Sequence, residues 1–492
     1  MIFNPTLYEI NTRVFLRRYD TETKKARLKD VPLEYWKSLS ELGFNLIWLM
    51  GVWKTNESII EKCCYEEGLR SSYDKALKDW SDEDVIGSPY AVDEYVLNPD
   101  IATVDEFLSI KEYINSLDMQ LILDFVPNHL SAESAYIKTN PEIFLQCKND
   151  LYGGDRHTFF AHSSSGDIVF AHGRDPFFPA WTDTIQINYF ATEARKFMTD
   201  RLMYIASLCD GVRCDMAMLI LNNVFQNTWG GVLTEQGFTK PKSEFWREAI
   251  TTVAKEHPQF IFLAEAYWDL EWDLQQLGFD FTYDKRLLDR LKNAPTESIK
   301  SHFHAESSYQ KKSVRFLENH DEDRAVTSLG RERSIAAAIV ISTVPGLRFF
   351  HDGQLEGRKI KLPVQLGREP KEQVNLITQA AYKKLLGIIK KDVFKDGEWQ
   401  LLDAIPSWPD NELYQNMLAW EWSAKQERIL VIVNYSKEQS QCRVKLELPG
   451  YAEQLTLYDL WGGGRYERSS SEVVRDGLFV DLAPWSAHIM EF

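Results

Sequence analysis

Short apolar runs alternate with amphipathic stretches from the start of the chain to about residue 395. Runs of this kind indicate buried strands, and apolar positions that recur every three or four residues indicate helices. The predicted strands are Leu7–Phe15, Asn45–Val52, Gln120–Val126, Gly211–Met216, Phe260–Ala266, Phe279–Tyr283, Ser313–Leu317 and Leu347–Phe350. The predicted helices include Pro32–Leu42, Val104–Leu117, Glu193–Leu208, Ser243–His257, Glu332–Ser342 and Glu372–Lys391. Eight βα repeats predict an α/β protein with a closed (β/α)8 TIM barrel, since open doubly wound sheets usually have fewer strands.

Two stretches depart from this repeat. Residues 130–181, which follow the third strand, are irregular and rich in Gly, Asp, His and Phe, as is typical of a functional insertion. After about residue 399, short alternating strands separated by turn residues predict an antiparallel β-sandwich. We therefore expect a barrel in two parts, residues 1–129 and 182–397, an inserted subdomain at 130–181 and a C-terminal β-sandwich at 398–492.

Charge and composition narrow the classes of partner. The 492 residues include 56 Lys and Arg against 73 Asp and Glu, a net charge of -17. A field of this sign repels nucleic acid and anionic lipid surfaces but allows a neutral substrate. We expect a cytoplasmic protein, because no basic leader, bilayer-length apolar run or paired CxxC spacing is found. No particular oligomeric state is predicted.

Polar clusters end four of the predicted strands, where barrel enzymes assemble their sites. They are Asp124 to His129 (DFVPNH), Gly211 to Asp215 (GVRCD), Leu263 to Glu265 (LAE) and Phe316 to Asp321 (FLENHD). Arg213 and Asp215 are two residues apart, so both point to the barrel interior, where the guanidinium would hold Asp215 ionised. Apolar neighbours should raise the pKa of Glu265.

One ionised and one protonated carboxyl group are what retaining glycoside hydrolysis requires. We assign Asp215 as the nucleophile and Glu265 as the general acid and base. Asp321 and His320 would bind hydroxyl groups of the reacting sugar more tightly in the transition state, and His129 would donate to another hydroxyl of that ring. For Asp124, a purely structural role that pairs with Arg213 and fixes it is as good an interpretation as a functional one.

The four clusters, in this order on an eightfold βα pattern, resemble the conserved regions of glycoside hydrolase family 13, the α-amylase family. The resemblance implies Asp215 as nucleophile, Glu265 as acid/base and Asp321 as the third, transition-state-stabilising carboxylate, supported by Arg213, His129 and His320. Gly87 to Tyr90 (GSPY) is similar to the family segment whose Tyr stacks on the cleaved sugar, which implies that role for Tyr90.

Some features depart from the commoner family pattern. Met216 to Met218 replaces the Lys-His pair that contacts the departing glucan in many α-amylases, so the leaving-group side should be less polar. Asn128 matches a residue that ligates structural calcium in many relatives, but a calcium site needs 6–8 oxygens, so calcium stays an open expectation and no cofactor is required. The basic residues at 357–361 would either meet an anionic sugar or pair with the acidic surface.

The resulting hypothesis is a retaining α-glycosidase that acts on α-glucans or malto-oligosaccharides by double displacement. Transglycosylation or phosphorolysis through the same intermediate is the alternative. A non-catalytic carbohydrate-binding or ancillary protein is less well supported, because the three carboxylates are retained and the membrane anchor of such subunits is missing from this sequence.

Overall fold

A closed eight-stranded barrel forms the centre of the molecule. The computed structural model describes residues 4–148, 153–425, 427–448 and 452–492. The barrel strands are all parallel and follow the order β1-β15-β14-β13-β12-β11-β5-β2. Their bounds are β1 Thr6–Asn11, β2 Leu46–Met50, β5 Gln120–Phe125, β11 Gly211–Cys214, β12 Ile261–Ala264, β13 Phe281–Tyr283, β14 Ser313–Arg315 and β15 Leu347–His351. All eight predicted strands are present, so the predicted barrel is confirmed.

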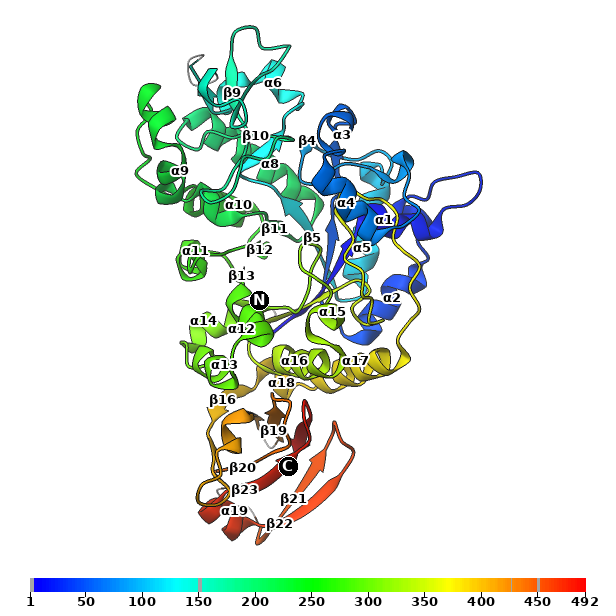
Figure 1. Cartoon of the computed structure of the whole chain (residues 1–492), viewed down its shortest axis with the longest axis vertical. Coiled ribbons are helices and arrows are strands. Elements are labelled where there is room, and N and C mark those ends of the chain that lie inside the picture. The colour runs from blue at the N-terminus through cyan, green and yellow to red at the C-terminus, as the bar shows by residue number, and fades with distance from the viewer. Residues whose placement is uncertain (1–3, 149–152, 426, 449–451) are drawn as a thin grey trace.

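Helices cover the outside of the barrel (Figure 1). They include α2 Leu33–Leu42, α5 Val104–Ser116, α8 Thr192–Leu208, α10 Phe245–Glu256, α12 Lys285–Asn293, α16 Arg331–Thr343 and α17 Leu376–Ile389. The strands are buried on both faces, which is why they read as continuous apolar runs rather than as alternating ones. Polar residues on these strands are therefore exceptions that need a structural or chemical reason.

Two predicted boundaries lie four residues from the observed ones, Phe15 against Asn11 and Glu372 against Leu376, each for a local reason. The first strand ends at Asn11, whose side chain accepts a hydrogen bond from the Val14 N–H and begins the short helix α1, Thr12–Leu16. A side-chain cap of this kind starts a helix even within an apolar run. The predicted helix from Glu372 begins instead at Leu376, where Asn375 caps it through the N–H groups of Ile377 and Thr378.

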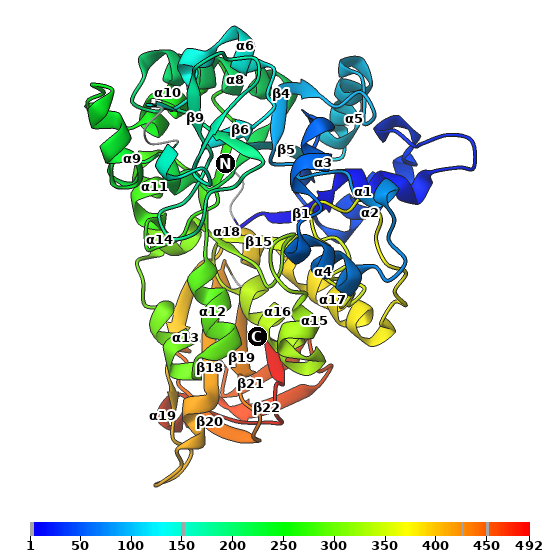
Figure 2. The same ribbon diagram turned by 45° about the horizontal axis from the view of Figure 1, so that its top comes forward.

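The segment between β5 and α8 forms two small antiparallel sheets beside the barrel mouth (Figure 2). One pairs β6, His129–Ser131, with β10, Thr184–Gln186, and the other contains β7 Gln146–Cys147, β8 Phe159–Ala161 and β9 Val169–Ala171. Residues 149–152 lie outside the described part. The β6–β10 pair places His129 at the edge of the barrel mouth.

The C-terminal region has two antiparallel sheets, which confirms the predicted sandwich. The larger sheet contains β16 Glu398–Leu402, β18 Met417–Ala424, β19 Glu427–Asn434, β24 Ala487–Glu491, β21 Gln454–Asp459 and β22 Arg465–Ser469. The smaller sheet contains β17 Ala404–Ile405, β20 Ser440–Val444 and β23 Leu478–Leu482. Apolar side chains of both sheets share one buried cluster. Trp422 docks the larger sheet on the barrel, because its indole N–H donates to the Thr343 carbonyl at 2.6 Å.

None of the helices in the described residues combines the length and apolar character needed to cross a membrane.

Candidate active site

The residues singled out in the sequence meet at the carboxyl ends of four barrel strands. Asp215 directly follows β11, Glu265 directly follows β12, and Asp321 lies six residues beyond the end of β14. Asp124 lies near the end of β5. This is the face on which barrel enzymes carry out their chemistry.

Arg213 is the centre of the site. Its side chain is completely buried, and its guanidinium donates to Asp215 Oδ1 at 2.6 Å and contacts Glu265 Oε2 at 2.8 Å. The guanidinium also lies 5.2 Å from the ring centroid of Trp48 and 5.4 Å from that of Tyr90. One cation therefore holds two carboxyl groups of neighbouring strands on the same side of the barrel mouth.

Glu265 has a hydrogen-bond partner at each of its carboxyl oxygens. Its Oε1 accepts from the Tyr267 hydroxyl at 2.8 Å and its Oε2 accepts from the Met216 N–H at 2.7 Å. Burial raises the pKa of Glu265 to about 7, although Arg213 opposes that shift. The pKa of Asp215 is also raised by burial and opposed by Arg213. Arg213 makes a hydrogen bond to Asp215 but only an ion-pair contact to Glu265. We therefore assign to Glu265 the proton that these two carboxyl groups retain near neutral pH.

Asp321 differs from the other two carboxylates because half of its side chain is exposed. Its Oδ2 lies 2.9 Å from His320 Nε2, and the opposite ring nitrogen, Nδ1, bonds Glu9 on β1. The neighbouring carboxylates overcome the burial of His320 and raise its pKa to about 10, so the ring is positively charged at neutral pH. This charge holds the pKa of Asp321 well below its usual range, against desolvation. Asp321 is thus an ionised group at the open side of the site.

Tyr90 and His129 complete the arrangement. The Tyr90 hydroxyl lies 2.8 Å from His320 Nε2, and the two rings stack with their centroids 5.3 Å apart. Burial lowers the pKa of His129 to about 3, so its ring is neutral. The Asn128 amide lies 3.4 Å from His129 Nδ1 and can only donate there, which leaves the proton on Nε2. His129 thus carries one N–H donor, and the main chain of Tyr90 is a hydrogen-bond partner of its ring.

Asp124 does not make the direct pair with Arg213 that the sequence suggested. Its carboxylate accepts from the Trp48 indole N–H at 3.2 Å and from the Gly51 N–H at 2.8 Å. Arg213 and Asp124 are in register on neighbouring strands, but the Asp124 carboxylate bonds Trp48 and Gly51 instead. Asp124 instead fixes Trp48, and the guanidinium of Arg213 lies over the Trp48 ring. Asp124 therefore supports Arg213 indirectly, through Trp48.

The surroundings of Asn128 do not fit a calcium cage. Gln186 Nε2 donates to the Asn128 carbonyl at 2.7 Å and to its Oδ1 at 3.0 Å, which puts an amide donor where a cation would have to lie. Among the residues that the structure describes, no group of three or more His, Cys, Asp or Glu side chains is arranged to hold a metal ion.

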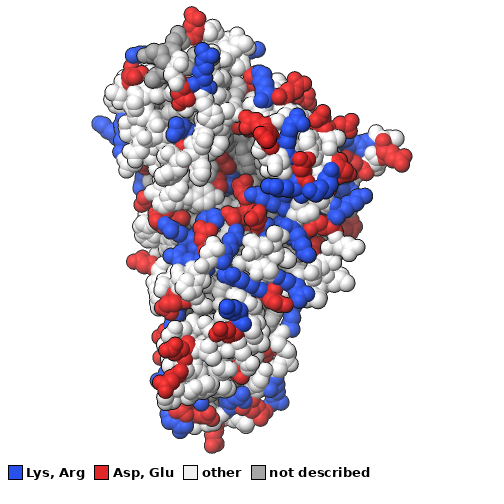
Figure 3. All heavy atoms as spheres, viewed as in Figure 1, with Lys and Arg blue, Asp and Glu red and all other residues white. Residues whose placement is uncertain are grey.

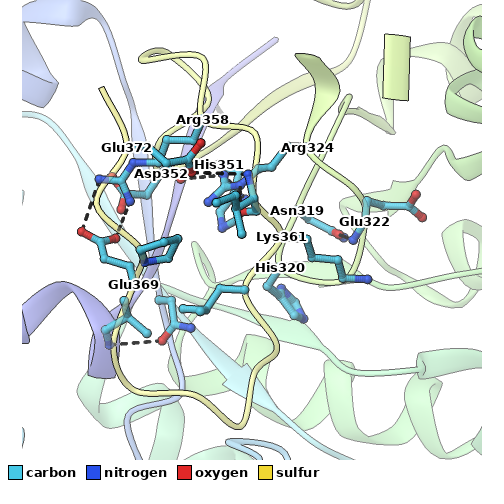
Figure 4. Close-up of a pocket in the computed structure, with 15 residues that line it drawn as sticks. Asn319, His320, Glu322, Arg324, His351, Asp352, Arg358, Lys361, Glu369 and Glu372 are labelled. Atoms are coloured by element: carbon cyan, nitrogen blue, oxygen red, sulfur yellow. Dashed lines mark hydrogen bonds and ion pairs between the residues drawn. The ribbon is translucent and has the colours of Figure 1, made fainter. Parts of the chain in front are cut away.

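A polar pocket lies beside Asn319 and His320 (Figure 4). Its cavity volume is about 30 Å³, and the segment after β15 bounds it. Arg358 of this segment pairs with Glu369, whereas Lys361 donates to the main-chain carbonyl of Asp321. The sequence left open whether the basic residues at 357–361 meet an anionic sugar or pair with acidic residues of the protein. Arg358 does the latter.

Aromatic side chains lie on the Glu265 side. Phe177 of the insertion meets Trp268 edge to face, with ring centroids 5.0 Å apart, and Phe177 is 68% exposed. Figure 3 shows a mostly uncharged face over the insertion and α9, Asn222–Glu235, while acidic and basic side chains intermingle elsewhere. Phe177 therefore exposes an aromatic ring next to Trp268, three residues beyond Glu265.

Sequence reasoning missed several residues that hold the site together. The Tyr267 hydroxyl donates to Glu265, and the Tyr283 hydroxyl accepts from Arg213. The ring of Trp48 lies against the Arg213 guanidinium. Glu9 was missed although a buried charge inside the apolar run Leu7–Ile10 was a usable signal.

Comparison with known proteins places the chain in a family. The profile described as "Alpha amylase, catalytic domain" matches residues 32–384. The chain belongs to the α-amylase family. Within this family, Alpha-amylase 3 of Dictyoglomus thermophilum is 20% identical over 294 residues, which cover 56% of this chain and 55% of that protein.

Two further relatives extend the comparison. The alpha-1,4-glucan:maltose-1-phosphate maltosyltransferase of Picrophilus torridus is 22% identical over 283 residues, covering 56% of this chain and 39% of that protein. The matches thus span about half or less of these two curated relatives. A crystal structure of maltogenic α-amylase AmyB from Thermotoga neapolitana, 19% identical, superimposes with a TM-score of 0.69 over 99% of this chain and 98% of that one. This similarity shows that the fold extends over both the barrel and the sandwich.

Proposed function

We propose that this α-amylase family member is a retaining α-glycosidase that acts on α-glucans or malto-oligosaccharides. The observation that carries the proposal is the single guanidinium of Arg213, which holds Asp215 and Glu265 beside the ionised Asp321. Two carboxyl groups with different protonation, flanking one bond, are the requirement for double displacement at a sugar.

In the first step, Glu265 donates its proton to the oxygen of the departing sugar while Asp215 attacks the anomeric carbon from the opposite face. The glycosidic C–O bond breaks and a covalent glycosyl ester of Asp215 forms. Asp321 and His129 bind hydroxyl groups of the same ring, and these hydrogen bonds strengthen as the ring flattens and gains positive charge.

In the second step, Glu265 is ionised and removes a proton from water, which attacks the anomeric carbon and releases Asp215. The pKa of about 7 allows Glu265 to serve in both directions near neutral pH. Tyr267 donates to Glu265 Oε1, while the Met216 N–H and Arg213 hold Oε2. Both oxygens of the carboxyl group are therefore fixed in place.

Transglycosylation is the second candidate function, favoured by the apolar leaving-group side. Phe177 presents an exposed ring there, next to the partly buried ring of Trp268, and sugar faces stack on such rings. A bound sugar acceptor would displace water in the second step. The maltosyltransferase among the relatives gives this alternative independent support.

Product analysis tests the proposal. Maltoheptaose, pullulan, sucrose and trehalose are incubated with the protein, with and without phosphate, and products are separated by chromatography. Shorter maltosides with the α configuration support hydrolysis, longer ones support transfer, and sugar phosphates formed only with phosphate support phosphorolysis. No product from any α-glucoside, or persistence of wild-type turnover in Asp215→Asn, would refute the assignment.

We extend the proposal to a cytoplasmic location. Cys63, Cys64, Cys209, Cys214 and Cys442 are free thiols, which are typical of a reducing compartment. Cell fractionation with antibody detection tests this, and recovery outside the cytoplasm would contradict it.

A further inference from the structure

Glu9 is a fully buried carboxylate inside the barrel. It lies on β1 in register with Trp48 of β2 and His351 of β15, and none of its surface is exposed. A charged group at such a position is strongly destabilising unless another group compensates the charge. Structural stability alone therefore gives no reason for a carboxylate at this position.

Two histidines face this carboxylate. Oε1 bonds His320 Nδ1, whereas Oε2 is buried without a hydrogen-bond partner and lies 3.9 Å from His351 Nε2. The other groups on the surrounding elements are Tyr283 of β13, whose pKa Glu9 helps to raise, and the pair Glu318 and Arg324, which contacts the far side of His351. The His320 ring is therefore the partner that compensates Glu9 directly.

His320 lies between two carboxylates, since its Nε2 contacts Asp321 and its Nδ1 contacts Glu9. Two protons on the ring satisfy both carboxylates, and the Tyr90 hydroxyl, 2.8 Å from Nε2, then accepts from the N–H that also faces Asp321. Glu9 thus fixes both the charge and the orientation of the ring. Removal of the Glu9 charge would leave His320 free to lose a proton and turn, and Asp321 would lose its fixed partner.

We propose that Glu9 is a positioning residue, which acts through His320 to hold the third carboxylate, Asp321, ionised and in place for the transition state. Contacts between side chains lead from Glu9 through His320 to Asp321, that is, from the buried wall of the barrel to the open side of the site. The ring of Tyr90 packs against that of His320. This inference rests on the proposed glycosidase function for its kinetic consequence, but its structural part does not.

The direct test is nuclear magnetic resonance of the protein with ¹⁵N-labelled histidine, with the His320 signals assigned by their loss in His320→Gln. In the wild type, His320 should be doubly protonated through neutral pH. A neutral His320 ring at neutral pH would overturn the proposal without any further variant. This measurement needs no turnover, so an absence of glycosidase activity would refute only the proposed function.

Glu9→Gln keeps the size of the side chain and removes its charge. The pKa of His320 should fall by about 1–3 units, the usual effect of losing an opposite charge at contact distance. Glu318→Gln is the matched control, because Glu318 is a buried carboxylate of the same cluster that contacts His351 but not His320. It should leave the His320 titration unchanged, and an equal shift in both variants would contradict the proposal.

Kinetics supply the second readout. Glu9→Gln should lower kcat by about 10- to 100-fold with little change in KM, because the interaction acts in the transition state. In a His320→Gln background, the same change should have no further effect, since Glu9 acts only through that ring. Independent, multiplicative effects of the two substitutions would overturn the proposal.

Discussion

Replacing Arg213 by Lys tests the arrangement on which the proposed chemistry depends. The planar guanidinium reaches Asp215 with one nitrogen and Glu265 with another, at 2.6 and 2.8 Å. A Lys ammonium is a single point charge on a flexible stem, so it satisfies one carboxylate and leaves the other buried without a partner. Breaking a buried ion pair costs about 3 kcal/mol at the lower end of the usual range. If that free energy is lost from the transition state, kcat/KM falls by about 100-fold.

The assay is steady-state hydrolysis of an activated α-glucoside by Arg213→Lys and the wild type. The control is Arg315→Lys, which changes another fully buried arginine, one that pairs with Asp284 outside the site. The control variant should be less stable to heat but lose no more than a few-fold in kcat/KM. If Arg213→Lys keeps a third or more of wild-type kcat/KM, the account of a shared guanidinium is refuted.

Three more predictions follow from the site and the fold. Because Glu265 must hold its proton in the first step and its pKa is about 7, kcat/KM for an unactivated maltoside should fall as the pH rises through about 7, and a flat profile there would contradict its role as the acid. Trp422→Ala should destabilise the protein by about 3–5 kcal/mol in urea unfolding, whereas Trp422→Phe should lose much less; equal losses would disprove the packing argument. Treatment with EDTA should leave the thermal midpoint unchanged because Gln186 occupies the oxygens of Asn128, and a fall that calcium reverses would contradict this.

The barrel was predictable because its strands are buried on both faces and separated by regular helices. At the two corrected boundaries a single capping side chain was the cause, as when Asn11 ends the first strand within an apolar run. Strand β22 was missed because its sequence, Arg-Tyr-Glu-Arg-Ser, is polar and largely exposed. It is a strand because it pairs with β21, and no apolar pattern indicates such pairing.

The carboxyl groups of the proposed site were predictable for a different reason. Asp215, Glu265 and Asp321 follow apolar strands directly or after a short turn, and strand ends converge in a barrel. The groups that support them come from elements far apart in the sequence. The contact between Glu9 and His320 spans 311 positions, and no local pattern indicates which distant residue will meet a buried carboxylate.

The central claim is that Asp215 forms a covalent bond to the sugar. The most direct measurement is mass spectrometry of Glu265→Gln after incubation with an α-glucosyl fluoride, whose leaving group needs no proton from residue 265. The account predicts that the protein gains the mass of one glycosyl unit, that the unit maps to the peptide containing Asp215, and that azide releases it. A product released without such an adduct, or an adduct on any other residue, would contradict the account.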